Sequence, residues 1–169
     1  TIFHNFSIAS DRYVVVNVDT FEDIIDAIGG VEIEVHEELI DESKGWHFLP
    51  GWQLMNGEVA LQYARIRRHD SDFGRVERQT QVIMAVRDRV IQPNVFPRLP
   101  AIANQFADDT STDLTRVEIT SLICILPLIP DANLHTFSVG RTEATGARTT
   151  EGQSVLLVNS GPMSSLIYQ

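Results

Sequence analysis

The sequence lacks most of the features that mark a disulfide-bonded, membrane-spanning or metal-binding protein. Its one cysteine, Cys124, excludes a disulfide within this chain and leaves the compartment open. The longest apolar run, residues 122–130, is far shorter than a bilayer span and contains two prolines, so we predict no membrane helix. The five histidines lack the spacing of metal ligands, and we predict no zinc site.

Charge is distributed unevenly along the 169 residues, whose formal net charge is −10. The first 42 residues hold eleven acids and one base, so the rest of the chain sums to zero. Residues 65–89, here called the basic segment, carry seven bases against four acids. Twelve of the thirteen bases are arginine, which favours bidentate contacts with carboxylate or phosphate but also fits a bias in genomic composition. We expect no nucleic-acid partner, because this net charge steers the chain poorly toward polyanions.

Predicted strands and helices alternate along the chain. β-branched and alternating residues predict a buried strand over 12–18, a strand with one wet face over 31–35, and further strands over 134–139 and 155–158. Helical spacing predicts helices over 20–28, over 57–66, over about 75–90, and from a cap at Asp113 to about 126. Gly29 and Gly30 end the first helix, Asn56 caps the second, and residues 37–51 read as a polar loop. We therefore predict one α/β domain over residues 1–169, a layered α/β/α arrangement with a central mixed β-sheet flanked by helices.

Five side chains of the basic segment are placed to meet an anion. Arg65 and Arg67 leave the end of one predicted helix, while Arg75, Arg78 and Gln79 lie in the first turns of the next. Arg75 and Gln79 are four residues apart and share a helix face. Cations at a helix N-terminus oppose the helix dipole unless an anion lies between them. Phosphate suits such a site, because guanidinium groups and backbone amides both donate hydrogen bonds to it.

A salt-bridged surface loop is the alternative. Two guanidinium charges about 6 Å apart repel by about 3 kcal/mol at an effective dielectric of about 20, so the cluster needs counter-charge. Asp70, Asp72 and Glu77 could supply that charge internally, and a bound pyrophosphate could supply it from outside. Both explanations stay open on spacing alone.

Three blocks of sequence resemble the LytR-CpsA-Psr family. They are Gly29–Val31 as a GGV strand entry, Gly57–Arg67 as G-x-x-A-L-x-Y-x-R-x-R, and Asp72–Gln79 as D-F-G-R-x-x-R-Q. Members of that family are bacterial cell-envelope phosphotransferases. They move a glycopolymer, such as a teichoic acid or capsular polysaccharide, from a polyprenyl pyrophosphate carrier to peptidoglycan with the help of Mg²⁺.

The resemblance implies roles for particular residues. It implies a pyrophosphate head-group site made of Arg65, Arg67, Arg75, Arg78 and Gln79. Arg75 and Asp72 are the implied catalytic residues, and Asp72 either orients an arginine or helps to deprotonate the attacking sugar hydroxyl. The implied partners are a polyprenyl pyrophosphate-linked glycopolymer and the peptidoglycan acceptor. The carrier's tail needs an apolar tunnel. Apolar residues of the flanking helices could wall it, but we predict that they pack in the core instead: Val59, Tyr63, Val82, Ile83 and Val86.

Against the family pattern, Thr1 corresponds to a point inside the domain. We expect two acidic Mg²⁺ ligands, a further head-group arginine and a membrane anchor upstream of Thr1, and no metal ligand within this chain. The resemblance implies a location on the extracellular face of the bacterial cytoplasmic membrane. Two classes of function stay open: a phosphotransferase, active as the intact protein, and a non-catalytic polyprenyl (pyro)phosphate-binding module that lacks the metal site.

Overall fold

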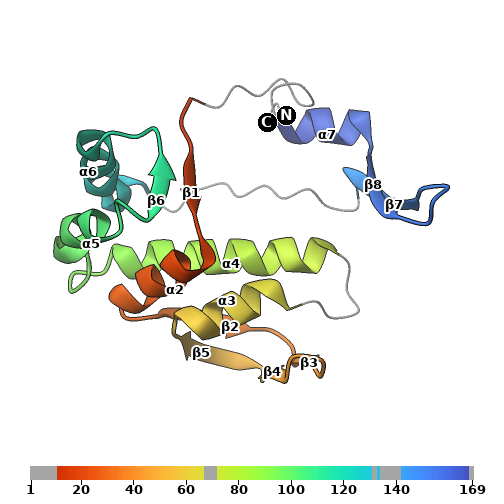
Figure 1. The fold of residues 1–169 in the computed structure, drawn as a ribbon, viewed down its shortest axis with the longest axis horizontal. Coiled ribbons are helices and arrows are strands. Elements are labelled where there is room, and N and C mark those ends of the chain that lie inside the picture. The colour runs from red at the N-terminus through yellow and green to blue at the C-terminus, as the bar shows by residue number, and fades with distance from the viewer. Residues whose placement is uncertain (1–10, 67–71, 131–132, 134–141, 168–169) are drawn as a thin grey trace. The chain divides into compact units, whose positions relative to one another are not determined.

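The computed structural model describes residues 11–66, 72–130, 133 and 142–167. They belong to two compact units, a larger one within Ser10–Leu134 and a smaller one whose described part lies within His135–Gln169 (Figure 1). The prediction of one domain over residues 1–169 stays a prediction. None of the helices in the described ranges is long and apolar enough to cross a membrane.

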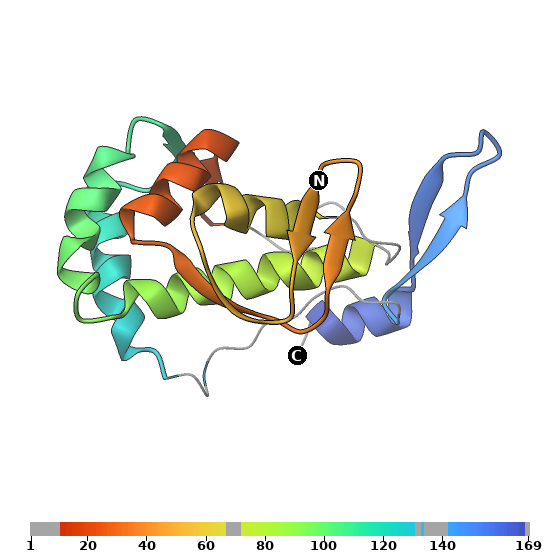
Figure 2. The ribbon, with the colours of Figure 1, turned by 90° about the horizontal axis from the view of Figure 1, so that it is seen from below.

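Helices dominate the larger unit. In chain order they are α2 (Val18–Ala27), α3 (Gly57–Arg65), α4 (Asp72–Val90), α5 (Leu99–Gln105) and α6 (Arg116–Ile125). Short 3₁₀ turns at Phe96–Arg98 and Leu126–Leu128 precede α5 and follow α6. Helices α2 and α3 pack against each other and α3 packs on α4, as Figures 1 and 2 both show.

The strands of this unit pair two by two. Antiparallel pairs join β1 (Val14–Val16) to β6 (Thr110–Thr112), β2 (Val31–Val35) to β5 (Gly51–Met55), and β3 (Leu39–Asp41) to β4 (Trp46–Phe48). The mixture of helix and strand confirms the predicted α/β class. Within the described ranges the strands form separate antiparallel pairs and not one mixed sheet.

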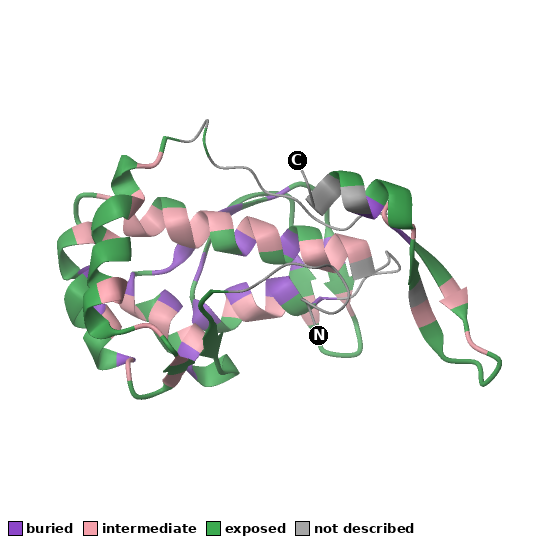
Figure 3. Ribbon diagram, turned by 90° about the horizontal axis from the view of Figure 1, so that it is seen from above, coloured by how far each residue is buried: buried purple, intermediate pink, exposed green. Residues whose placement is uncertain are grey.

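The core lies between β2 and the helices α2, α3 and α4. Alternate side chains of β2 are buried at Val31, Ile33 and Val35, while Glu32 and Glu34 face solvent, as the alternation predicts. Figure 3 shows that the buried residues lie mainly in the part of the chain where these helices pack together. The predicted ends of α2 and start of α3 are confirmed: Gly29 has a φ of 86°, and the Asn56 side chain accepts a hydrogen bond from the Val59 amide at 2.9 Å.

Two predictions of burial are wrong. The strand predicted over 12–18 exists as β1, but Val14, Val15 and Val16 are 55%, 58% and 39% exposed. The β1–β6 pairing satisfies backbone groups of β1 but does not cover these side chains. On α4, Ile83 is 67% exposed, while its neighbour Val82 is in the core.

The loop predicted over 37–51 is wrong as well, because it holds the β3–β4 hairpin and the start of β5. Leu39 and Phe48 face each other across the hairpin and are both buried. Strands of three residues are too short to show a period in the sequence, and the acidic and glycine residues of the turn dominate the composition.

Helix α6 begins two residues later than predicted, capped by Thr115 and not by Asp113. The Thr115 hydroxyl and the Glu118 carboxylate bond each other's backbone amides, which is a capping box. Asp113 instead accepts a hydrogen bond from the Tyr13 amide at 2.9 Å. Arg12 completes the contact between β1 and α6, with its Nη2 atom 3.0 Å from Glu118 Oε1.

We expect this contact to weaken in acid. Hydrogen bonds from the Thr115 amide and hydroxyl and from Arg12 lower the pKa of Glu118 from 4.5 to about 2. A carboxylate with a lowered pKa stabilises the fold above its unfolded pKa and loses that effect as the pH falls through its folded pKa. The difference in unfolding free energy between wild type and Glu118→Gln should therefore be constant above about pH 5 and vanish between pH 4.5 and 2. Urea unfolding across this range measures it, and a difference independent of pH would contradict the assignment.

The smaller unit consists of an antiparallel hairpin and a helix. Strands β7 (Ala144–Arg148) and β8 (Ser154–Val158) pair along their length, and α7 (Ser160–Ile167) follows. Strand β8 confirms the prediction over 155–158, and the strand predicted over 134–139 lies outside the described residues.

Candidate anion-binding site

A cleft of about 550 Å³ lies where the end of α3, the first turns of α4 and the β3–β4 hairpin meet. Its walls are formed by Asp41, Ser43, Lys44, Arg65, Arg75 and Gln79. The structure thus brings together three of the residues predicted for the head-group site and adds three from the hairpin. We call this space the basic cleft.

The two helices supply one wall of the basic cleft. Arg65 is the last residue of α3 and is exposed, while its neighbour Ile66 is completely buried and anchors the chain there. Arg75 and Gln79 stand one helical turn apart on α4, as their spacing predicts. Donors from two separate helices therefore point into one space.

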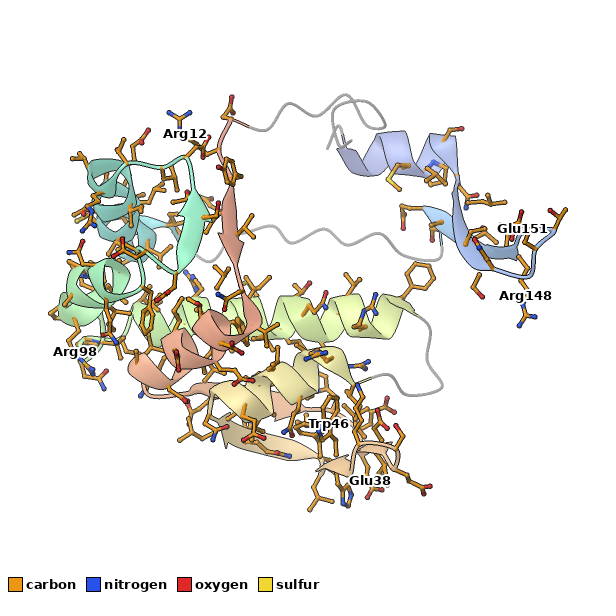
Figure 4. The ribbon with its side chains drawn as sticks, in the orientation of Figure 1. Arg12, Glu38, Trp46, Arg98, Arg148 and Glu151 are labelled. Atoms are coloured by element: carbon orange, nitrogen blue, oxygen red, sulfur yellow. The ribbon has the colours of Figure 1, made fainter. Side chains whose placement is uncertain are left out.

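Tyr63 holds the three parts of the site together. Its hydroxyl donates a hydrogen bond to Gln81 Oε1 of α4 at 2.6 Å, and burial raises the pKa of the phenol. Its ring meets Phe48 of β4 edge to face, with the ring centroids 5.4 Å apart. This contact docks the hairpin against the C-terminal end of α3, where Figure 4 shows the labelled Trp46 and Glu38.

Arg78 does not line the basic cleft. It is only 6% exposed, and its Nη2 atom donates a hydrogen bond to the Ile66 carbonyl at 2.7 Å. It also lines a smaller cavity of about 160 Å³ together with Glu77 and Tyr63. The structure shows Arg78 joining α4 to the end of α3, which positions Arg65 and Arg75, and its contact with a ligand stays a prediction.

Other arginines of the basic segment form contacts within the protein. Arg89 donates from Nε to the Ile28 carbonyl at 3.0 Å and from Nη2 to the Gly29 carbonyl at 3.2 Å, which caps the end of α2. Arg87 bonds Asp88 at 2.8 Å. Arg67 and the side chain of Asp72, both predicted for the site, lie outside the described residues.

The basic cleft is cationic although the chain is acidic. Among the described residues that line it, three cations, Arg65, Arg75 and Lys44, stand against one carboxylate, Asp41, which gives these residues a net formal charge of +2. Asp41 Oδ1 already accepts hydrogen bonds from the Ser43 amide at 3.1 Å and hydroxyl at 2.5 Å. Glu77, one of the acids considered as internal counter-charge, lines the smaller cavity instead. This arrangement suits a ligand with two negative charges.

The described residues do not fit a metal site. In the ranges that the structure describes, no three histidine, cysteine or acidic side chains lie close enough together to hold a metal ion. Asp41 is the one carboxylate among the described residues that line the basic cleft. The Mg²⁺ cofactor stays a prediction.

A second, largely apolar cavity of about 540 Å³ lies among α2, α5 and α6. Ile24, Leu99, Phe106 and Ile119 are among its walls. None of the residues considered for a lipid tunnel lines it. Those residues are instead buried in the core or packed against it, apart from the exposed Ile83.

Fold and site together define an α/β protein whose cationic cleft suits a phosphate-bearing ligand. The LytR_cpsA_psr family model matches residues 1–168, and the chain belongs to this family, as predicted.

Curated relatives carry names that describe one kind of reaction. The chain is 32% identical over 146 residues to the polyisoprenyl-teichoic acid–peptidoglycan teichoic acid transferase TagV of Bacillus subtilis. The matched segment covers 82% of this chain and 37% of that protein. It is 35% identical over 117 residues to TagU of Halalkalibacterium halodurans, a transferase of the same description. This match covers 68% of this chain and 38% of that protein. The chain thus spans less than two fifths of the length of these relatives.

Solved structures confirm the fold. The crystal structure of B. subtilis TagV superposes with a TM-score of 0.83 at 25% identity, covering 99% of this chain and 65% of that one. The protein gbs0355 of Streptococcus agalactiae gives a TM-score of 0.81 at 20% identity, covering 99% of this chain and 58% of that one.

Proposed function

We propose that the basic cleft binds the pyrophosphate of a polyprenyl-linked glycopolymer, and that the protein transfers this glycopolymer to peptidoglycan. The observation that carries the proposal is the convergence of Arg65, Arg75 and Gln79 from two helices on one cleft of net positive charge. The names of TagV and TagU, which describe transfer of teichoic acid from a polyisoprenyl carrier to peptidoglycan, support the substrate class.

The proposed reaction moves one phosphoryl group. A hydroxyl oxygen of the acceptor attacks the sugar-bearing phosphorus, a new P–O bond forms, and the bond to the bridging oxygen breaks. Polyprenyl phosphate leaves with the electron pair, and the hydroxyl proton passes to a base. Guanidinium groups of Arg65 and Arg75 would stabilise the charge that develops on the non-bridging and leaving oxygens.

The remaining predicted roles belong to this proposal. Arg67 would join the head-group site, and Asp72 would orient an arginine or accept the hydroxyl proton. Bound Mg²⁺ would supply further charge neutralisation at the phosphates. The apolar cavity among α2, α5 and α6 offers space for the carrier's isoprenoid tail. We place the reaction on the extracellular face of the cytoplasmic membrane, where peptidoglycan is accessible to a membrane-anchored protein.

Binding and turnover are tested separately on the full chain. Titration with farnesyl pyrophosphate, a soluble short polyprenyl pyrophosphate, should show saturable binding that weakens with added salt, because the contacts are charged. Absence of binding would contradict the proposal and favour the salt-bridged loop.

A binding module without turnover is the second candidate. Arg65, Arg75, Lys44 and Gln79 among the described lining residues supply donors for an anion, which suffices for binding without turnover. Incubating the chain with a polyprenyl pyrophosphate-linked glycopolymer, peptidoglycan and Mg²⁺ distinguishes the two functions. Transfer of glycopolymer to peptidoglycan rejects the module, whereas binding without transfer, with TagV transferring under the same conditions, supports it.

A further inference from the structure

The β3–β4 hairpin contributes to the lining of the basic cleft beside the two helices. Its three lining residues, Asp41, Ser43 and Lys44, come from a segment outside the basic segment. The turn is fixed from within, because the Lys44 amide donates to the Asp41 carbonyl at 3.2 Å and Asp41 Oδ1 bonds Ser43. The ring contact of Phe48 with Tyr63 fixes the hairpin against α3.

Lys44 is the sole lysine of the chain, and its ammonium group has a defined place. The Nζ atom lies 4.3 Å from the centroid of the Trp46 ring, which is a cation–π contact. No carboxylate in the described ranges forms an ion pair with it. The aromatic face therefore holds the ammonium at the cleft without neutralising its charge.

Comparing the charge of the donor's pyrophosphate with that of the lining residues indicates a role for the Lys44 ammonium group. A pyrophosphate linked at both ends carries two negative charges, one on each phosphate. With Lys44 the described lining residues carry a net formal charge of +2, and without it they carry +1. Arg65 and Arg75 come from the two helices and can take one phosphate, while Lys44 lines the same cleft from the hairpin and can supply counter-charge for the other.

We propose that Lys44, held by Trp46, binds the second phosphate of the donor and lets the site distinguish a pyrophosphate from a monophosphate. This inference rests on the proposed function and extends its binding site to the hairpin. The ammonium acts as a binding group and takes no part in proton transfer.

Two probes and three variants test the role of Lys44. Lys44→Met should weaken binding of farnesyl pyrophosphate about tenfold, the loss expected for one charge-assisted contact, and change binding of farnesyl monophosphate less than about twofold. Lys44→Arg should keep most of the affinity for both probes. Trp46→Leu should weaken pyrophosphate binding less than Lys44→Met does, because the ammonium remains but loses its fixed place. Thermal unfolding confirms that each variant is folded.

Labelling of the wild-type chain gives a second measurement. An amine-reactive reagent can modify only Lys44 and the α-amino group, and mass spectrometry separates the two products. Saturating pyrophosphate should protect Lys44 strongly, and saturating monophosphate should protect it weakly. Equal protection by the two probes, or equal weakening of both by Lys44→Met, would overturn the inference. If Arg75→Ala weakens both probes while Lys44→Met weakens neither, only the inference fails; if neither variant weakens either probe, the proposed function fails.

Discussion

Replacing Arg75 or Arg65 by alanine is expected to weaken binding of farnesyl pyrophosphate by about 10–100-fold for each residue. Each substitution removes charge-assisted hydrogen bonds worth about 1.5–3 kcal/mol from a cleft whose described lining residues carry a net formal charge of only +2. Calorimetric titration at fixed ionic strength measures the loss. Because both guanidinium groups would hold the same anion, the double variant should lose less binding free energy than the sum of the two single losses.

Arg98→Ala is the matched control for charge. It removes the same positive charge from the same compact unit, and its side chain is exposed and does not line the basic cleft. Figure 4 places Arg98 at the end of this unit away from Trp46 and Glu38 of the hairpin. Affinity should stay within about twofold of wild type, as expected for an exposed charge at a distance. Unchanged affinity in both Arg65→Ala and Arg75→Ala would contradict the binding site and support the alternative, in which these arginines form a salt-bridged surface loop.

Spacing on a helix predicts which residues of the basic segment can share a face, but not what each face meets. Arg75 and Gln79 were placed together by their four-residue spacing, and the structure brings both to the cleft. Arg78, on the neighbouring row, turns toward the Ile66 carbonyl, and Arg89 caps α2. A guanidinium that binds a carbonyl looks the same in sequence as one that binds a phosphate, because both use the same donors.

The hairpin wall of the cleft was missed for a different reason. Lys44 lies 21 positions before Arg65 in a segment predicted as a loop, and tertiary packing, such as the contact of Phe48 with Tyr63, brings the two to one cleft. Local pattern carries no information on such a contact. The helices α2 and α3 were predicted well because their caps and glycine ends are local signals.

Gly57→Ala is expected to cost about 2–4 kcal/mol of unfolding free energy, at the upper end of overpacking substitutions. Gly57 begins α3 where it crosses α2, and a Cβ there would lie 2.5 Å from the Glu22 Cα and nearer still to the Glu22 carbonyl oxygen. These are backbone atoms, so no rotamer change relieves the contact. The helices would have to separate, which also stretches the 2.7 Å hydrogen bond from the Gly57 amide to Asp26 Oδ1. Urea unfolding followed by far-UV circular dichroism measures the cost.

Two controls separate this clash from a general effect of alanine at a helix start. Gly161→Ala changes a glycine in the first turn of α7 that has open space around it, and should leave stability within about 0.5 kcal/mol. Glu22→Ala combined with Gly57→Ala should stay as unstable as Gly57→Ala alone, because the Glu22 side chain is not what a new Cβ meets. Rescue by Glu22→Ala would mean that α2 and α3 approach through side chains. Since α3 carries Arg65 at its far end, a separation of α2 from α3 should also weaken pyrophosphate binding, which links this packing contact to the geometry of the basic cleft.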